Sequence, residues 1–156
     1  MGLVESGTLV FVIDDDVEVC AGIADVLTME GYETRSLRSA DAAWSSLVAG
    51  AQPAIIVLDL WLQGMSSAEF VRRLRASDRA GVRVLLLSAS ASVAASEIDC
   101  DAVARKPLEP TSLVRAVDKL ARSYRRKAAA RALPGSSPPR HRARPRGGGR
   151  RRDGAV

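Results

Sequence analysis

Cysteine, histidine and aromatic residues are scarce in this chain. Its 156 residues include two cysteines, one histidine and 4% aromatic residues. Cys20 and Cys100 stand far apart, without a CxxC partner or a plausible set of further metal ligands. We therefore expect neither a disulfide framework nor a cysteine-held metal centre.

Long hydrophobic runs are also missing. The longest uninterrupted aliphatic run covers residues 54–58, far short of the roughly 18–20 residues that cross a bilayer. No basic segment precedes an apolar stretch at the N-terminus, so no secretion signal is expected. We predict a cytoplasmic protein without membrane insertion. Its 47% hydrophobic and 26% charged residues are typical of one soluble domain.

The net charge of +5 divides into two parts of opposite sign. Residues 122–156 hold twelve Lys or Arg against one acid, a net charge of +11, whereas residues 1–121 hold eleven basic and seventeen acidic residues, a net charge of −6. From about Ala128 the chain is mainly Ala, Arg, Pro, Gly and Ser, which bury too little apolar surface to offset the entropy cost of ordering. We predict a folded domain over residues 1–127 and a disordered basic tail over residues 128–156.

Apolar strand-like runs alternate with helical periodicity five times along residues 1–127. This alternation is typical of an α/β fold, in which helices cover both faces of a parallel sheet. Asp16 and Pro110 stand where the first and last helices are expected to begin, as a cap and a first-turn proline. The predicted strands are residues 9–13, 32–37, 54–58, 84–87 and 102–105.

Polar residues follow four of these strands directly. Because crossovers between parallel strands are right-handed, the carboxyl ends of all five strands meet at one edge of the sheet, where such folds bind ligands. Several carboxylates packed there would repel one another unless a cation neutralised them, and Mg²⁺ suits oxygen ligands. The residues at this edge are Asp14, Asp15 and Asp16, then Asp59, Ser88 and Lys106.

Four short segments carry a resemblance to a known family. They are residues 12–16 (VIDDD), 57–65 (VLDLWLQGM), 86–89 (LLSA) and 106–107 (KP). Because the four segments occur in this order, the chain resembles a bacterial response-regulator receiver domain, the phosphoacceptor half of two-component signalling, over about residues 8–125. The resemblance implies a flavodoxin-like, doubly wound sheet with strand order 2-1-3-4-5.

The resemblance also implies roles for the residues at the sheet edge. Asp59 would be the phosphoacceptor, and Mg²⁺ would be held by Asp14, Asp15, Asp59 and the backbone carbonyl of Trp61. Lys106 and the metal would stabilise the charge of the transferring phosphoryl group, and the Ser88 hydroxyl would donate to it. The donor would be a sensor histidine kinase, a phosphotransfer protein or a small phosphodonor.

The same resemblance predicts a signalling protein rather than an enzyme. No output-domain pattern follows, so we expect a stand-alone receiver that acts on an unknown output protein through its last helix and the neighbouring strand. The basic tail would bind nucleic acid without sequence specificity or grip an acidic partner, would be a plain solvated extension, or would fold back on the acidic part of the chain.

The chain departs from the family pattern at several positions. Gln63 and the pair Ser66-Ser67 replace a frequent Pro and Asp-Gly, which predicts a less rigid loop. Trp61 is bulky enough to shield an acyl phosphate from water. The Ser/Ala-rich residues 90–96 predict a short or mobile fourth helix. Val103 stands where the family carries a switching aromatic residue.

Two other functions stay open. A degenerate receiver would act as a phosphorylation-independent scaffold or, through its basic tail, as a nucleic-acid adaptor. A Mg²⁺-dependent phosphatase with an aspartate nucleophile would use the Asp-x-Asp pair formed by Asp14 and Asp16, followed by a Ser and a Lys. That hypothesis leaves Asp59 without a role.

Overall fold

A computed structural model describes residues 7–89 and 97–133 of the chain. Within this part, five parallel strands form one sheet in the order β2-β1-β3-β4-β5, which confirms the predicted topology. The strands are β1 (Leu9–Ile13), β2 (Glu33–Leu37), β3 (Ile55–Asp59), β4 (Arg83–Ser88) and β5 (Ala102–Arg105). The helices are α1 (Val17–Met29), α2 (Ala40–Val48), α3 (Ser67–Ala76) and α5 (Pro110–Ala132).

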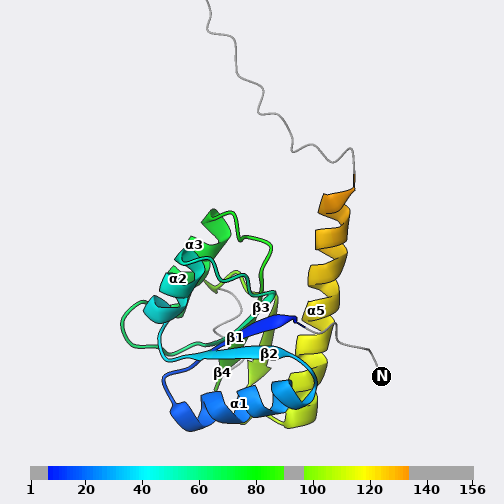
Figure 1. Cartoon of the computed structure of the whole chain (residues 1–156). Coiled ribbons are helices and arrows are strands. Elements are labelled where there is room, and N and C mark those ends of the chain that lie inside the picture. Colours follow the sequence, from blue (N-terminus) through cyan, green and yellow to red (C-terminus); the bar gives the residue numbers. More distant parts are fainter. Residues whose placement is uncertain (1–6, 90–96, 134–156) are drawn as a thin grey trace, which may run out of the picture.

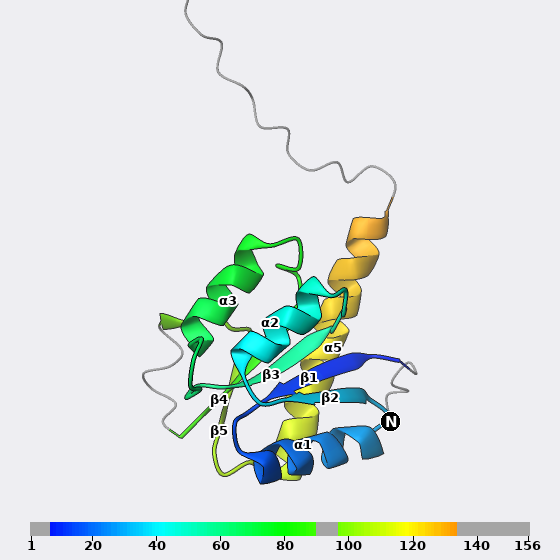
Figure 2. The same cartoon turned by 60° about the vertical axis from the view of Figure 1, so that its left-hand side comes forward.

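Helices cover both faces of the sheet (Figure 1, Figure 2). Alternate side chains of a strand point to opposite faces, so Val10 and Val12 pack on the side of α1 and α5, whereas Phe11 and Ile13 pack on the side of α2 and α3. Because both faces are covered, β3 is buried along its whole length. This explains why the central strands are continuous apolar runs rather than alternating ones.

Serine and aspartate side chains begin three of the helices. The Asp16 carboxylate accepts hydrogen bonds from the backbone N–H groups of Glu18 and Val19, which confirms the predicted cap of α1. Ser39 caps α2 and Ser66 caps α3 in the same way. These caps satisfy N–H groups that have no partner within their own helix. They also set where each loop leaves the edge of the sheet that carries the polar residues.

The last helix is longer than the sequence predicted. We expected disorder from Ala128, but α5 continues to Ala132, so the prediction is wrong for residues 128–132. The reason is local: four of these five residues are alanine and the fifth is Arg131, and both residue types favour helix even without burial. Residues 134–156, the rest of the predicted tail, lie outside the described residues, as do residues 90–96 of the predicted fourth helix. No helix in the described ranges is long and apolar enough to cross a membrane.

Candidate functional site

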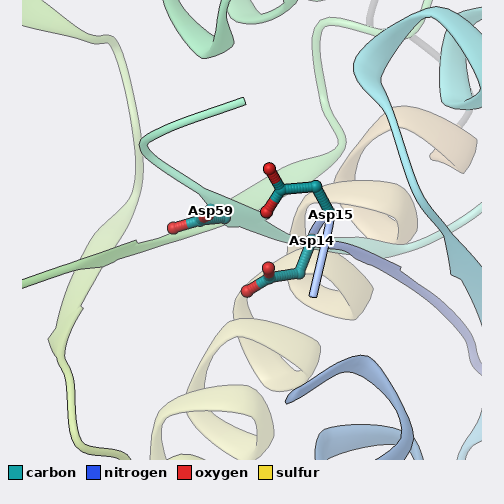
Figure 3. A group of neighbouring side chains, drawn as sticks. All are labelled: Asp14, Asp15 and Asp59. Atoms are coloured by element: carbon teal, nitrogen blue, oxygen red, sulfur yellow. The ribbon is translucent and has the colours of Figure 1, made fainter. Parts of the chain in front are cut away.

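The acids that follow β1 and β3 lie close together. The two strands are neighbours, with Ile13 opposite Leu58, so the next residues, Asp14 and Asp59, leave the sheet side by side. Asp15 joins them, and one carboxylate oxygen from each residue lies within 4.8 Å of the others. Figure 3 shows the three side chains at the ends of their strands. The predicted carboxylate cluster therefore forms.

Lys106 bridges the two buried acids of this cluster. Its Nζ lies 3.1 Å from Oδ2 of Asp14 and 3.1 Å from Oδ1 of Asp59. The strand pairing brings it there: β5 runs beside β4, and the Lys106 backbone N–H donates to the carbonyl of Ser88 over 2.9 Å. Burial alone would lower the pKa of Lys106, but hydrogen bonds and charges from Asp14 and Asp59 raise it. The side chain is therefore a fixed ammonium group at neutral pH.

The cluster holds more negative than positive charge. Asp14 is 1% exposed and Asp59 is 6% exposed, whereas Asp15 is exposed to solvent. Burial raises the pKa of Asp59, and the nearby charge of Asp14 raises it further, although Lys106 and the backbone N–H of Trp61 oppose the shift. One ammonium group thus faces three carboxylates. Such an excess of oxygen ligands suits a hard divalent cation.

Asp16, the third acid of the first run, is not part of the cluster. Its carboxylate caps α1, while its backbone N–H donates to Oδ1 of Asp14 over 2.9 Å. This hydrogen bond orients the Asp14 carboxylate. The phosphatase hypothesis requires the carboxylates of Asp14 and Asp16 to act together, and the structure turns that of Asp16 to the helix instead.

Ser88 and Trp61 lie at the border of the cluster. Ser88 ends β4 and is buried, at 1% exposure. Trp61 is 76% exposed and lines, together with Ser88, Ala89 and Ile98, a groove of about 480 Å³. The contact of the Ser88 hydroxyl with a phosphoryl group and the binding of metal by the Trp61 carbonyl stay predictions.

Ser67 is a buried residue of the site that sequence reasoning missed. It is 1% exposed, and its hydroxyl donates to the backbone carbonyl oxygens of Asp59 at 2.5 Å and Leu60 at 3.1 Å. The sequence carried a signal, because a serine replaced the glycine that is frequent at this position of the family. The structure shows a side-chain link to β3 that glycine cannot make. The less rigid loop stays a prediction.

The family model described as "Response regulator receiver domain" matches residues 10–118. The chain belongs to this family. Val103 stands at the position where the resemblance places a switching aromatic residue. It pairs with Leu86 of β4 and packs on the side of α2 and α3.

Individual relatives agree with this assignment. The DNA-binding response regulator MtrA of Mycobacterium tuberculosis is 31% identical over 109 residues, which cover 67% of this chain and 46% of MtrA. The chain spans about half or less of the length of the curated relatives it matches. A putative response regulator from Chloroflexus aurantiacus superposes with a TM-score of 0.69 at 25% identity, over 74% of this chain and 98% of that one. TrrA of Thermotoga maritima, solved in complex with Mg²⁺-BeF, gives a TM-score of 0.66 at 22% identity, over 72% and 98% of the two chains.

Proposed function

We propose that this receiver accepts a phosphoryl group on Asp59 in a Mg²⁺-dependent reaction and signals through protein–protein contacts. The observation that carries the proposal is the position of the Asp59 carboxylate, which is buried, clustered with Asp14 and Asp15, and held 3.1 Å from the ammonium group of Lys106. Each transfer modifies the receiver itself, so the protein acts as a signalling component rather than as an enzyme that turns over substrate.

Asp14, Asp15 and Asp59 would hold the Mg²⁺ ion. Their oxygens are the ligand type that this ion prefers, and they lie close enough to share it. When bound, Mg²⁺ supplies positive charge that stabilises the oxygens of a transferring phosphoryl group. The Trp61 carbonyl, two residues beyond Asp59, is the proposed fourth protein ligand.

The chain's own residues supply the rest of the chemistry. A carboxylate oxygen of Asp59 forms a bond to phosphorus while the bond from phosphorus to the donor breaks, and the electron pair of that bond stays on the donor, as on the imidazole nitrogen of a phosphohistidine. Lys106 already contacts this carboxylate and is placed to neutralise charge on the phosphoryl oxygens. We assign the Ser88 hydroxyl as a donor to one of those oxygens.

The donor we propose is a sensor histidine kinase or a phosphotransfer protein, with a small acyl phosphate as a substitute. A groove of about 420 Å³ adjoins Lys106 between α1 and the start of α5, and its walls are mostly apolar side chains such as Val19, Ile23 and Leu108. An apolar groove beside the reactive carboxylates suits a docking helix of a donor protein. Such donors work in the cytoplasm, which is the location we propose.

The competing functions receive less support. The cap formed by Asp16 argues against the phosphatase. The complete set of Asp14, Asp59 and Lys106 argues against a degenerate scaffold, because a buried cluster of like charges is costly to keep without a use. The nucleic-acid adaptor depends on the basic tail over residues 128–156, of which residues 134–156 lie outside the described residues.

The test is phosphorylation of the full chain by acetyl phosphate with Mg²⁺, followed by mass spectrometry of the intact protein. We expect the mass gain of one phosphoryl group, its loss in Asp59→Ala, and its retention in Asp25→Asn, which changes an exposed acid on α1. Binding of beryllofluoride with Mg²⁺, the pair present in the TrrA structure, gives a second readout through tryptophan fluorescence, to which Trp44 and Trp61 both contribute. Failure of both readouts would leave the degenerate scaffold, and turnover of phosphate esters that depends on Asp14 would indicate the phosphatase.

A further inference from the structure

The outer side of α5 carries four basic residues in one line. Arg115, Lys119, Arg122 and Arg126 are spaced by three or four residues, which places them on one side of a helix. All four are exposed, while the residues on the opposite side of the helix, such as Leu113, Val117 and Leu120, are buried against the sheet. We call these four residues the basic stripe. From first to last it extends about 17 Å along the helix axis, at 1.5 Å per residue.

The basic stripe is not neutralised by acids in the described residues. None of its members forms an ion pair with another residue there, and the acid Asp118, on the flank of the same helix, binds the hydroxyl of Tyr32. An ordinary solvated helix interleaves its charges, as α3 does, where Glu69 pairs with both Arg72 and Arg73. Four like charges that form no ion pair within residues 7–89 and 97–133 repel one another, and a bound polyanion would relieve this repulsion.

The position of α5 separates this surface from the phosphorylation site. The helix begins near Lys106, at the carboxyl edge of the sheet, and its later residues Tyr124 and Arg125 lie beside the start of β1. Its C-terminal end extends past the sheet in both views (Figure 1, Figure 2). A ligand on the basic stripe would therefore leave the Asp59 cluster accessible.

We propose that the basic stripe of α5 is a binding surface for the phosphate backbone of nucleic acid. Three of its four residues are arginine, whose planar guanidinium group matches phosphate oxygens in pairs. A membrane surface is a poorer occupant, because a helix that lies in a bilayer needs an exposed apolar side and that of α5 is buried against the sheet. No aromatic side chain belongs to the stripe, so the recognition is of backbone charge rather than of base sequence.

The experiment measures the salt dependence of binding by the full chain to a fluorescein-labelled DNA duplex of arbitrary sequence. Each phosphate contact adds about −0.9 to the slope of log K against log salt concentration. In the variant R115Q/K119Q/R122Q/R126Q the slope should be less steep than in wild type by about three to four units. Between 50 and 200 mM salt, the affinity of the variant should therefore fall by a factor about 100-fold smaller than the affinity of wild type does. The control variant R35Q/R38Q/R72Q/R73Q removes the same net charge from four other exposed arginines and should keep the slope.

Every outcome bears on the proposal. A less steep slope in the stripe variant, with an unchanged slope in the control variant, supports the proposal, provided that circular dichroism shows the helix intact. Equal slopes in wild type and stripe variant would assign any DNA binding to other basic residues, such as those in residues 134–156, and would overturn it. Absence of DNA binding at low salt, or binding to anionic phosphatidylserine vesicles without binding to DNA, would also overturn it. None of these readouts depends on phosphorylation of Asp59, so the two proposals fail independently.

Discussion

The hydroxyl of Ser67 donates a hydrogen bond to the backbone carbonyl oxygen of Asp59 over 2.5 Å. The bond joins the first turn of α3 to the last residue of β3, and both residues are buried. The residue whose backbone accepts this hydrogen bond also carries the proposed phosphoacceptor carboxylate. The direction of that carboxylate therefore depends in part on a helix that begins eight residues later.

Ser67 should therefore affect phosphorylation as well as stability. Ser67→Ala leaves buried carbonyl oxygens without this donor, and such a loss costs about 1–3 kcal/mol. We expect a lower free energy of unfolding and a rate of Asp59 phosphorylation by acetyl phosphate reduced up to about tenfold, if about 1.4 kcal/mol of the loss reaches the transition state. Ser67→Thr should restore much of the rate.

Ser66→Ala is the matched control for this experiment. Ser66 begins the same helix and accepts a hydrogen bond from the N–H of Glu69, but it is exposed and its side chain does not bond to β3 in the described part of the chain. Loss of the Ser66 hydroxyl should cost about 1 kcal/mol of stability and leave the phosphorylation rate close to that of the wild type. Equal rates in Ser66→Ala and Ser67→Ala would contradict a positioning role for Ser67.

The ammonium group of Lys106 should weaken Mg²⁺ binding and speed phosphorylation. This group occupies the space between Asp14 and Asp59, so it competes electrostatically with a divalent cation. Lys106→Met should tighten Mg²⁺ binding in calorimetry but slow phosphorylation about 100-fold, as expected when one charge-stabilising donor is removed. Lys119→Met, on the exposed side of α5, should change neither quantity. Weaker Mg²⁺ binding in Lys106→Met would show that the lysine orders the carboxylates rather than competing for them.

Trp61 should lengthen the lifetime of the phosphorylated state. Its side chain is 76% exposed and lines the groove that also contains Ser88 and Ala89, so it is positioned to limit the access of water to an acyl phosphate. We expect faster loss of the phosphoryl group in Trp61→Asn, measured by intact mass after removal of acetyl phosphate. Met29→Asn replaces another exposed apolar side chain with the same polar one, far from the groove in sequence, and should leave the lifetime unchanged. An unchanged lifetime in Trp61→Asn would refute the shielding role.

Asp101 should contribute stability that disappears in acid. Burial would raise its pKa, but the Val84 N–H and the guanidinium groups of Arg75 and Arg83 outweigh burial and lower it. A lowered pKa in the folded state stabilises the protein at pH values above the pKa of the unfolded state, which is about 3.9. This stabilisation is lost as the pH falls from there through the pKa of the folded state.

The test of Asp101 is chemical denaturation of Asp101→Ala and wild type across pH. At pH 7 we expect the variant to lose about 1–2 kcal/mol, because three donors lose an acceptor whose side chain is 20% exposed. The difference should shrink as the pH falls below about 4. Asp99→Ala, whose side chain is 81% exposed and 3.6 Å from Arg75, should cost about 0.5 kcal/mol or less. A difference between Asp101→Ala and wild type that is independent of pH would exclude this ionic contribution.

The site was largely predictable from the sequence for a topological reason. Parallel strands end at a common edge, so Asp14, Asp59 and Lys106 had to lie at that edge once the five strands were recognised. The cap formed by Asp16 was also predictable, because it depends only on residues two and three positions away. A prediction from apolar content alone misses the extension of α5 to Ala132, because the helix propensity of alanine does not require burial.

The sequence by itself determined the order of strands and helices and the kinds of side chain at the sheet edge, since both follow from local periodicity and from the rules of chain connection. Tertiary structure alone decided which atoms meet there. The ammonium group of Lys106 lies between two carboxylates, and the hydroxyl of Ser67 reaches the backbone of Asp59. Such contacts depend on the packing of helices against the sheet to within an ångström, and no pattern in the linear chain records that distance.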